Sequence, residues 1–103
     1  MSKKTIYLSG AISNDRSHAK KFKAAQEKLE AKGYKVINPV EHVEKERGKK
    51  WLDYLIDCLC LIINEKPDII YLMKGWDRSA GAQIERLVFL KLEKKIMTER
   101  EDG

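Results

Sequence analysis

Short runs of consecutive apolar residues alternate along the chain with longer segments of mixed, periodic character. Residues 4–9 (KTIYLS) and 68–73 (DIIYLM) hold apolar side chains at successive positions, which is typical of strands buried on both faces of a parallel sheet. In residues 15–32, apolar side chains recur three and four positions apart among lysines, a spacing that predicts a helix. Gly33 follows this segment and is a common helix terminator. The chain is therefore predicted to combine buried parallel strands with amphipathic helices.

The remaining elements are predicted from shorter signals. They are a strand over residues 34–37, ended by Asn38 and Pro39; a helix over about residues 49–65, ended by Pro67; a helix from Ser79 or Asp77 to about residue 95; and a short fourth strand over residues 96–98. Residues 39–50 (PVEHVEKERGKK) are polar and charged, and we expect a loop or a mobile flap there. The polar tail after residue 98 is expected to fray.

Strand and helix alternate from the first element to the last, which indicates an α/β fold with a parallel sheet and helices on both faces. Because crossover connections are right-handed, few layouts remain, and we predict about four parallel strands in the order 2-1-3-4. In such sheets, ligands bind at the carboxyl ends of the strands, where the strand order reverses. Three loops are therefore candidates for a site: residues 10–15, 38–50 and 74–79.

Size and composition exclude several classes of protein. The chain has 103 residues, 43% of them hydrophobic, which suits one globular domain over residues 1–103 and excludes wholesale disorder. The most apolar stretch, residues 51–63, is too short to span a membrane. The apolar run near the N-terminus is too short for a signal peptide, so we expect a cytoplasmic protein. Cys58 and Cys60 suit that compartment, and their spacing on a helix points them apart, so we expect two reduced cysteines.

Positive charge is concentrated in the first half of the chain. Residues 1–50 hold 13 basic and 6 acidic side chains, a net charge of +7, whereas residues 51–103 hold 8 basic and 10 acidic ones, a net charge of −2. This asymmetry favours an anionic partner, unless the lysines of residues 15–32 simply form a hydrated helix face. That partner would be a nucleic acid or a nucleotide phosphate. The sequence argues against a nucleic acid, because it has neither interleaved aromatic residues nor a known nucleic-acid-binding motif.

Glu85 has unusual neighbours for a glutamate on a helix. The residues three and four positions away are Gly81, Ala82, Val88 and Phe89, and none of them is charged. A carboxylate on an apolar helix face is costly unless it is paired or functional. Two interpretations remain: a functional carboxylate, or a side chain at the edge of the face that reaches water.

A second carboxylate candidate lies on the preceding helix. Asp53 and Asp57 are four positions apart in an otherwise apolar and aromatic segment. Paired carboxylates serve glycosidic chemistry, and Asp57 and Glu85 form such a pair if the fold brings their helices together. The alternative is that both aspartates and Asn64 form the hydrated stripe of their helix.

The predicted loops hold residues suited to binding a ligand. Ser79 and Gly81 open the last helix, where free N–H groups attract anions, although a serine there is usually only a cap. Gly10 permits a tight turn and a close approach of a ligand. Trp76 follows the third strand and either stacks on a base or packs on its own helix, whereas we expect Trp51 in the core.

The sequence argues against several other kinds of site. Neither GxGxxG nor GxxxxGK[ST] occurs, which disfavours a standard dinucleotide site and a P-loop. His18 and His42 are isolated, and no ligand spacing suggests zinc. We therefore expect neither a metal ion nor a cofactor.

Five short motifs are spread over most of the chain. They are Tyr7-Leu8-Ser9-Gly10-Ala11-Ile12, Gly33-Tyr34-x-Val36 with Asn38-Pro39, Trp51-x-x-Tyr54-x-x-Asp57, Asp68-Ile69-Ile70-x-Leu72, and Gly75-Trp76-x-x-Ser79-x-Gly81-Ala82-x-x-Glu85. Together they cover roughly residues 4–97, and the last is the most specific of them. In this pattern the chain resembles the nucleoside 2-deoxyribosyltransferase-like superfamily, and within it a compact branch often encoded by phages.

The resemblance implies a flavodoxin-like three-layer fold and cleavage of N-glycosidic bonds in nucleosides or nucleoside monophosphates. The nucleophilic glutamate of the superfamily matches Glu85, the aspartate that contacts the departing base is best matched by Asp57, and the aromatic residue of the first strand matches Tyr7. In the nucleotide-hydrolase branch, a serine six residues before the glutamate binds the 5′-phosphate, and Ser79 has this spacing. That branch has a second serine where this chain has Ala11, so the chain departs from the phosphate-binding pattern there.

The remaining substrate contacts are expected from Ser9, Gly10, Gly81, Trp76 and Asn38. We expect a cofactor-free enzyme that cleaves or transfers at the N-glycosidic bond of a (deoxy)nucleoside or its monophosphate. The alternative is a nucleotide-binding protein that uses the same pocket without turnover. The superfamily resembled is usually dimeric or larger, and the apolar faces of the helices over residues 51–65 and 79–95 exceed what one sheet face covers, so we also expect a homo-oligomer.

Overall fold

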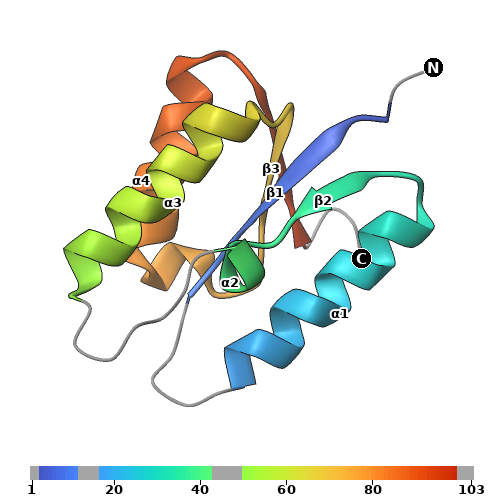
Figure 1. Cartoon of the computed structure of the whole chain (residues 1–103), viewed down its shortest axis with the longest axis horizontal. Coiled ribbons are helices and arrows are strands. Elements are labelled where there is room, and N and C mark those ends of the chain that lie inside the picture. Colours follow the sequence, from blue (N-terminus) through green and yellow to red (C-terminus); the bar gives the residue numbers. More distant parts are fainter. Residues whose placement is uncertain (1–2, 12–16, 43–49, 100–103) are drawn as a thin grey trace.

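The computed structural model of the chain describes residues 3–11, 17–42 and 50–99. Four parallel strands form one sheet in the order β2-β1-β3-β4: β1 (Thr5–Ser9), β2 (Lys35–Ile37), β3 (Ile69–Leu72) and β4 (Lys95–Thr98). Helix α1 (Ser17–Ala31) covers one face, and helices α3 (Trp51–Glu65) and α4 (Ala80–Lys91) cover the other (Figure 1). None of the helices in these ranges is long and apolar enough to cross a membrane. The chain is a flavodoxin-like α/β three-layer sandwich, which confirms the predicted strand order.

The central position of β1 and β3 explains their unbroken apolar runs. Ile6 and Leu8 join the core on the α1 side together with Phe22, whereas Tyr7 joins the core on the α3–α4 side together with Phe89. Successive residues of a strand point to opposite faces of the sheet. Because helices cover both faces, every position of these strands is buried and favours an apolar side chain.

The prediction of a loop over residues 39–50 is wrong at its start. Pro39–His42 forms a short helix, α2. Its first turn is held by Asn38, whose Oδ1 accepts a hydrogen bond from the N–H of Val40 at 3.0 Å. Proline is favoured at the first position of a helix, because its fixed φ suits the helix and no donor is lost there. The rest of the expected loop, residues 43–49, lies outside the described residues.

The last helix is shorter than the apolar pattern predicts. It ends at Lys91 rather than near residue 95, because the chain turns at Glu93, whose φ of 58° lies in the left-handed region. The N–H of Lys94 then donates to the carbonyl of Phe89 at 3.0 Å, which satisfies one carbonyl of the helix end. As a result, β4 begins at Lys95, one residue earlier than expected.

Candidate active site

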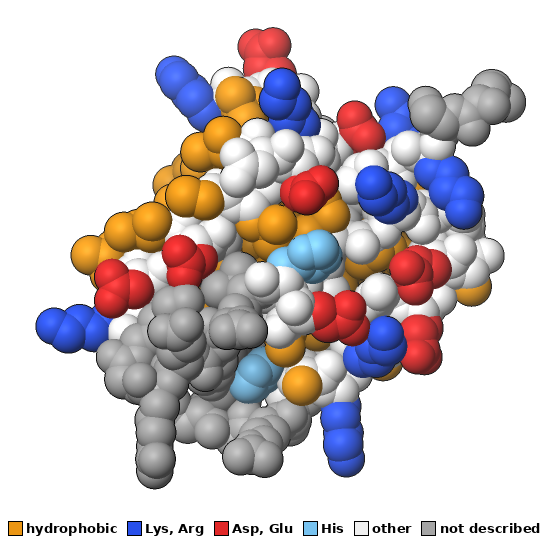
Figure 2. All heavy atoms as spheres, in the orientation of Figure 1, with side chains coloured by type: hydrophobic (Ala, Val, Ile, Leu, Met, Phe, Trp, Pro, Cys, Tyr) orange, Lys and Arg blue, Asp and Glu red, His pale blue; other side chains and the backbone are white. Residues whose placement is uncertain are grey.

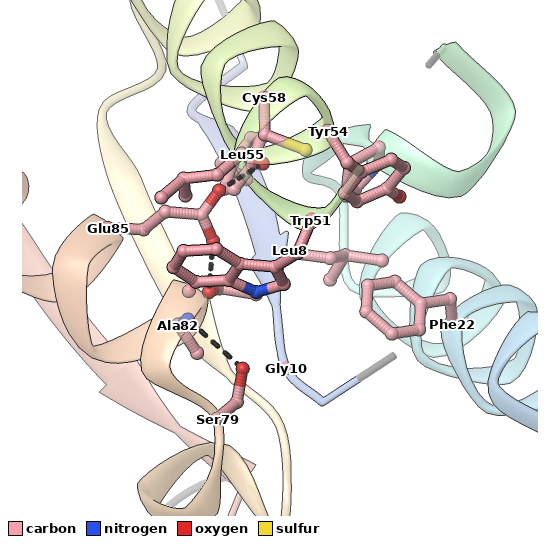
Figure 3. A pocket seen from close by; sticks show the side chains of 14 residues that line it. Leu8, Gly10, Phe22, Trp51, Tyr54, Leu55, Cys58, Ser79, Ala82 and Glu85 are labelled. Carbon is pink, nitrogen blue, oxygen red and sulfur yellow. Dashed lines mark hydrogen bonds between the residues drawn. The ribbon is translucent and has the colours of Figure 1, made fainter. Parts of the chain in front are cut away.

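A pocket opens at the carboxyl end of β1, between the first turns of α3 and α4 (Figure 3). Its cavity has a volume of about 90 Å³. The last residues of β1 and the following Gly10 line it, together with side chains of α3 and α4, and Phe22 and Pro39 complete the lining. Ligands bind at this end of the strands in open parallel sheets. The pocket therefore lies where this sheet topology predicts a ligand-binding site.

Glu85 is the one carboxylate among the described residues that line this pocket, and it is only 6% exposed. The Tyr7 hydroxyl donates to its Oε2 at 2.7 Å, and the Ser9 hydroxyl donates to its Oε1 at 2.7 Å. Tyr7 and Ser9 are two positions apart on β1, so strand geometry aims both side chains at the same face of the sheet. Because Glu85 is buried and both of its oxygens accept hydrogen bonds from protein hydroxyls, it does not reach water at the edge of its helix, and that interpretation is wrong.

The surroundings of Glu85 shift its acid–base behaviour. Burial raises the pKa of the Glu85 carboxyl above its ordinary value, and the hydrogen bonds from Ser9 and Tyr7 oppose that shift. Burial, and next the charge of Glu85, raise the pKa of Tyr7 well above its ordinary value. Tyr7 therefore remains a protonated donor at all ordinary pH values.

Helix α3 contributes two further polar side chains to the pocket, Tyr54 and Cys58. The hydroxyls of Tyr7 and Tyr54 lie near the Cys58 thiol and oppose the rise of its pKa, whereas the nearby charge of Glu85 adds to that rise. Burial, and next the charge of Glu85, raise the pKa of Cys58 to about 11. Burial likewise raises the pKa of Tyr54. Both groups therefore enter the pocket in their neutral, protonated forms.

The structure does not bring Asp57 into the lining of this pocket; Cys58, the next residue, is there instead. One residue corresponds to a rotation of about 100° around a helix, so neighbouring positions face different surroundings. Asp57 is half-buried and close enough to Cys58 for its charge to add to the rise of the Cys58 pKa, whereas Asp53 and Asn64 are exposed. The spacing of Trp51, Tyr54 and Cys58, three and four positions apart, was the sequence signal for the pocket-facing side of this helix.

Thiol reagents should modify the two cysteines at very different rates. Cys60 is exposed, whereas Cys58 is buried and its raised pKa leaves little of the reactive thiolate near pH 8. We expect the Cys58→Ser variant, which keeps Cys60, to react with Ellman's reagent about 100-fold faster than the Cys60→Ser variant. In denaturant, Cys58 of the Cys60→Ser variant should react as fast as an exposed thiol. Equal reaction rates in the two folded variants would contradict the burial of Cys58.

Ser79, Gly81 and Gly10 lie around the pocket as expected. The Ser79 hydroxyl accepts a hydrogen bond from the N–H of Ala82 at 3.2 Å and so caps α4. Gly10 lies where the chain leaves β1, and a Cβ atom there would lie 3.0 Å from the Cβ of Met73. A glycine therefore lets this turn pack closely on the end of β3 without displacing Met73.

Asn38 and Trp76, two of the expected substrate contacts, do not line this pocket. Asn38 is buried and donates from Nδ2 to the Gln26 side chain at 3.1 Å, in addition to holding the first turn of α2. Trp76 packs against the core on the α3–α4 side, and the Arg86 guanidinium lies 5.7 Å from its ring centre. The structure thus favours the interpretation of Trp76 as a packing residue.

Trp51 was expected in the core, and this prediction is wrong. The residue is 57% exposed and lines the pocket. It is the first residue of α3, at the helix end that faces the carboxyl edge of the sheet, so its side chain extends beyond the region that the sheet can cover. Sequence pattern alone treats it as one more apolar residue of that helix.

The described residues contain no group of three histidine, cysteine, aspartate or glutamate side chains that could hold a metal ion. Comparison with known families finds one model, described as "Domain of unknown function (DUF4406)", that matches residues 4–98. No curated protein and no solved structure matches the chain significantly.

Proposed function

The chain belongs to the DUF4406 family, and we propose that it cleaves or transfers at the N-glycosidic bond of a (deoxy)nucleoside or nucleoside monophosphate. The observation that carries this proposal is the buried Glu85 carboxylate, held by two hydroxyls inside a pocket at the carboxyl end of β1. A buried carboxylate with a perturbed pKa in a pocket is a candidate catalytic group. The likeness of the sequence to the nucleoside 2-deoxyribosyltransferase-like superfamily directs the proposal to glycosidic chemistry.

In the proposed reaction, an ionised Glu85 oxygen attacks C1′ of the sugar as the bond from C1′ to the base nitrogen breaks. The base takes the electron pair of that bond and a proton, and an ester between Glu85 and C1′ remains. Water or a second base then forms a bond to C1′ and gives up a proton to solvent, while the bond between C1′ and the Glu85 oxygen breaks and releases the carboxylate. The Tyr7 and Ser9 hydroxyls hold the carboxylate in one orientation and stabilise its charge when it leaves.

The proton for the departing base has more than one candidate source. The resemblance assigns contact with the base to Asp57, which lies on α3 beside the pocket lining. Tyr54 and Cys58 face the pocket in protonated form and add two donors near the same place. For a substrate with a 5′-phosphate, Ser79 and the first turn of α4 are the candidate contacts, although Ala11 departs from the phosphate-binding pattern.

The second candidate function is a nucleotide-binding protein without turnover. It is favoured by the state of Glu85, because both oxygens already accept hydrogen bonds and burial raises the pKa of the carboxyl. Each of these features lowers nucleophilicity at neutral pH. Incubation with a panel of nucleosides and nucleoside monophosphates, followed by chromatography for free base, separates the two functions. Release of base supports the enzyme, whereas calorimetric binding without release supports the binding protein.

We also propose that the chain forms a homo-oligomer through the outer sides of α3 and α4. Five large apolar side chains there are about half exposed or more: Leu52, Ile56, Ile63, Leu87 and Leu90. Figure 2 shows hydrophobic side chains gathered at the part of the surface where α3 lies. Extended exposed apolar patches mark interaction surfaces. Most oligomers of soluble proteins are assemblies of identical chains.

The Ile56→Glu variant should therefore be a monomer under conditions in which the unaltered chain is a dimer or larger. A charge at the centre of an apolar interface is buried without a partner and opposes association. Light scattering at tens of micromolar measures the mass of each. The Ala24→Glu variant adds the same charge on the exposed side of α1 and should keep the larger mass. A monomeric unaltered chain would contradict the proposal.

A further inference from the structure

The indole of Trp51 stands at the mouth of the pocket, over the first turn of α4. A Cβ atom built on Gly81 would lie 4.0 Å from the indole Nε1 and 3.9 Å from the Ser79 hydroxyl. Figure 3 shows the indole among the Glu85, Leu8 and Ala82 side chains. A large part of the residue nevertheless faces solvent, since it is 57% exposed. An aromatic surface that lines a pocket and is also open to solvent is available to a ligand.

The size of the cavity indicates which part of a nucleoside reaches which residue. At about 90 Å³, the cavity is well below the ~300 Å³ at which complete small-molecule sites begin. It therefore holds only part of a nucleoside. If Glu85 acts on C1′, the sugar must occupy the inner part, beside the carboxylate. The base must then lie toward the mouth, where Trp51 stands.

We propose that Trp51 is the platform on which the base of the substrate stacks, and that its contact with the base is a main determinant of affinity for nucleosides. This inference rests on the proposed function, because that function places the sugar beside Glu85. Stacking suits every nucleobase, since each has a flat π-face, so Trp51 should favour nucleosides over free sugars without selecting strongly among bases. Phe22 and Tyr54, which also line the pocket, provide further aromatic surface.

The test uses binding rather than turnover, and compares three variants of the full chain. We expect nucleosides such as deoxyadenosine and deoxycytidine to quench the tryptophan fluorescence of the unaltered protein. The Trp51→Ala variant should bind them about tenfold more weakly or worse, as expected for the loss of one stacking partner. The Trp51→Phe variant should retain most of the affinity but lose the quenching. The Trp76→Phe variant, which removes the other indole, should keep both.

Two controls separate this inference from its alternatives. Any affinity for 2-deoxyribose or ribose 5-phosphate, which have no base, should be the same in the Trp51→Ala and unaltered proteins. Circular dichroism melts and light scattering report whether Trp51→Ala alters folding or self-association instead. Unchanged nucleoside affinity in Trp51→Ala, or a change confined to oligomeric state, overturns the inference, as does the absence of any nucleoside binding. Trp51-dependent binding without base release leaves the inference standing and rejects the proposed catalysis.

Discussion

Replacing Glu85 by alanine should lower base release about 100-fold or more, the lower range expected for the loss of a catalytic group. The variant removes the proposed nucleophile and leaves the hydroxyls of Tyr7 and Ser9 in place but without their carboxylate partner. Initial rates of base release, measured by chromatography on the best substrate of the nucleoside panel, give the ratio. A variant that keeps the unaltered rate would end the proposal that Glu85 is the nucleophile.

Matched variants separate loss of chemistry from loss of structure. Glu85→Gln keeps the size of the side chain and one oxygen acceptor, and should be as inactive as the alanine variant. Tyr7→Phe and Ser9→Ala each remove one hydrogen bond to the carboxylate and should reduce the rate less than Glu85→Ala does. Thermal melts should show that all four variants fold. Loss of activity together with loss of the melting transition would point to a structural role.

As pH rises, the rate of base release should increase, whereas the contribution of Glu85 to the stability of the fold should decrease. The nucleophile must be ionised, so the rate should fall as pH is lowered through the raised pKa of Glu85. The pKa of Glu85 is higher in the folded protein than in the unfolded chain, so the folded state holds the proton more tightly. The contribution of Glu85 to the free energy of unfolding is therefore greatest at pH values below 4.5, the ordinary pKa of a glutamate. It declines as pH rises through the folded-state pKa. Glu85→Gln should remove that decline.

Replacing Phe89 by alanine should lower the free energy of unfolding by about 3–5 kcal/mol, because a buried aromatic ring is lost and a cavity remains. Phe89 has no exposed surface, and its ring lies against that of Tyr7 with the ring centres 6.3 Å apart. For a chain of this size such a loss is a large share of total stability. Denaturant titration followed by circular dichroism measures it.

The control for this prediction lies on the same helix. Lys91 is exposed in the last turn of α4, and Lys91→Ala should change the free energy of unfolding by less than about 0.5 kcal/mol. A loss below about 1 kcal/mol in Phe89→Ala would mean that the core on the α3–α4 side is much looser than its burial indicates. Because Phe89 contacts Tyr7, the variant should also weaken the positioning of the Glu85 carboxylate.

The arrangement of the sheet was predictable from the sequence because its determinants are local. A strand that is covered on both faces needs apolar side chains at successive positions, and residues 4–9 and 68–73 show this directly. Right-handed crossovers then limit the order of the strands. The boundaries were less predictable, since the end of α4 depends on the left-handed turn at Glu93 and the start of α2 on the Asn38 side chain.

What the sequence determined by itself was that Glu85 sits on an apolar helix face, because its neighbours at helical spacing are all uncharged. What only the tertiary structure decided was which groups meet that carboxylate. Tyr7 and Ser9 are 78 and 76 positions away in the chain, and only the pairing of β1 with β3 and the packing of α4 on them bring these hydroxyls within 2.7 Å. The same holds for α3, where the rotation of the helix against the sheet, and not its composition, turns Cys58 rather than Asp57 into the pocket and leaves Trp51 at its mouth. The spacing of apolar residues indicates that a helix has a buried side. The direction in which each side chain points depends on how the helix packs against the sheet.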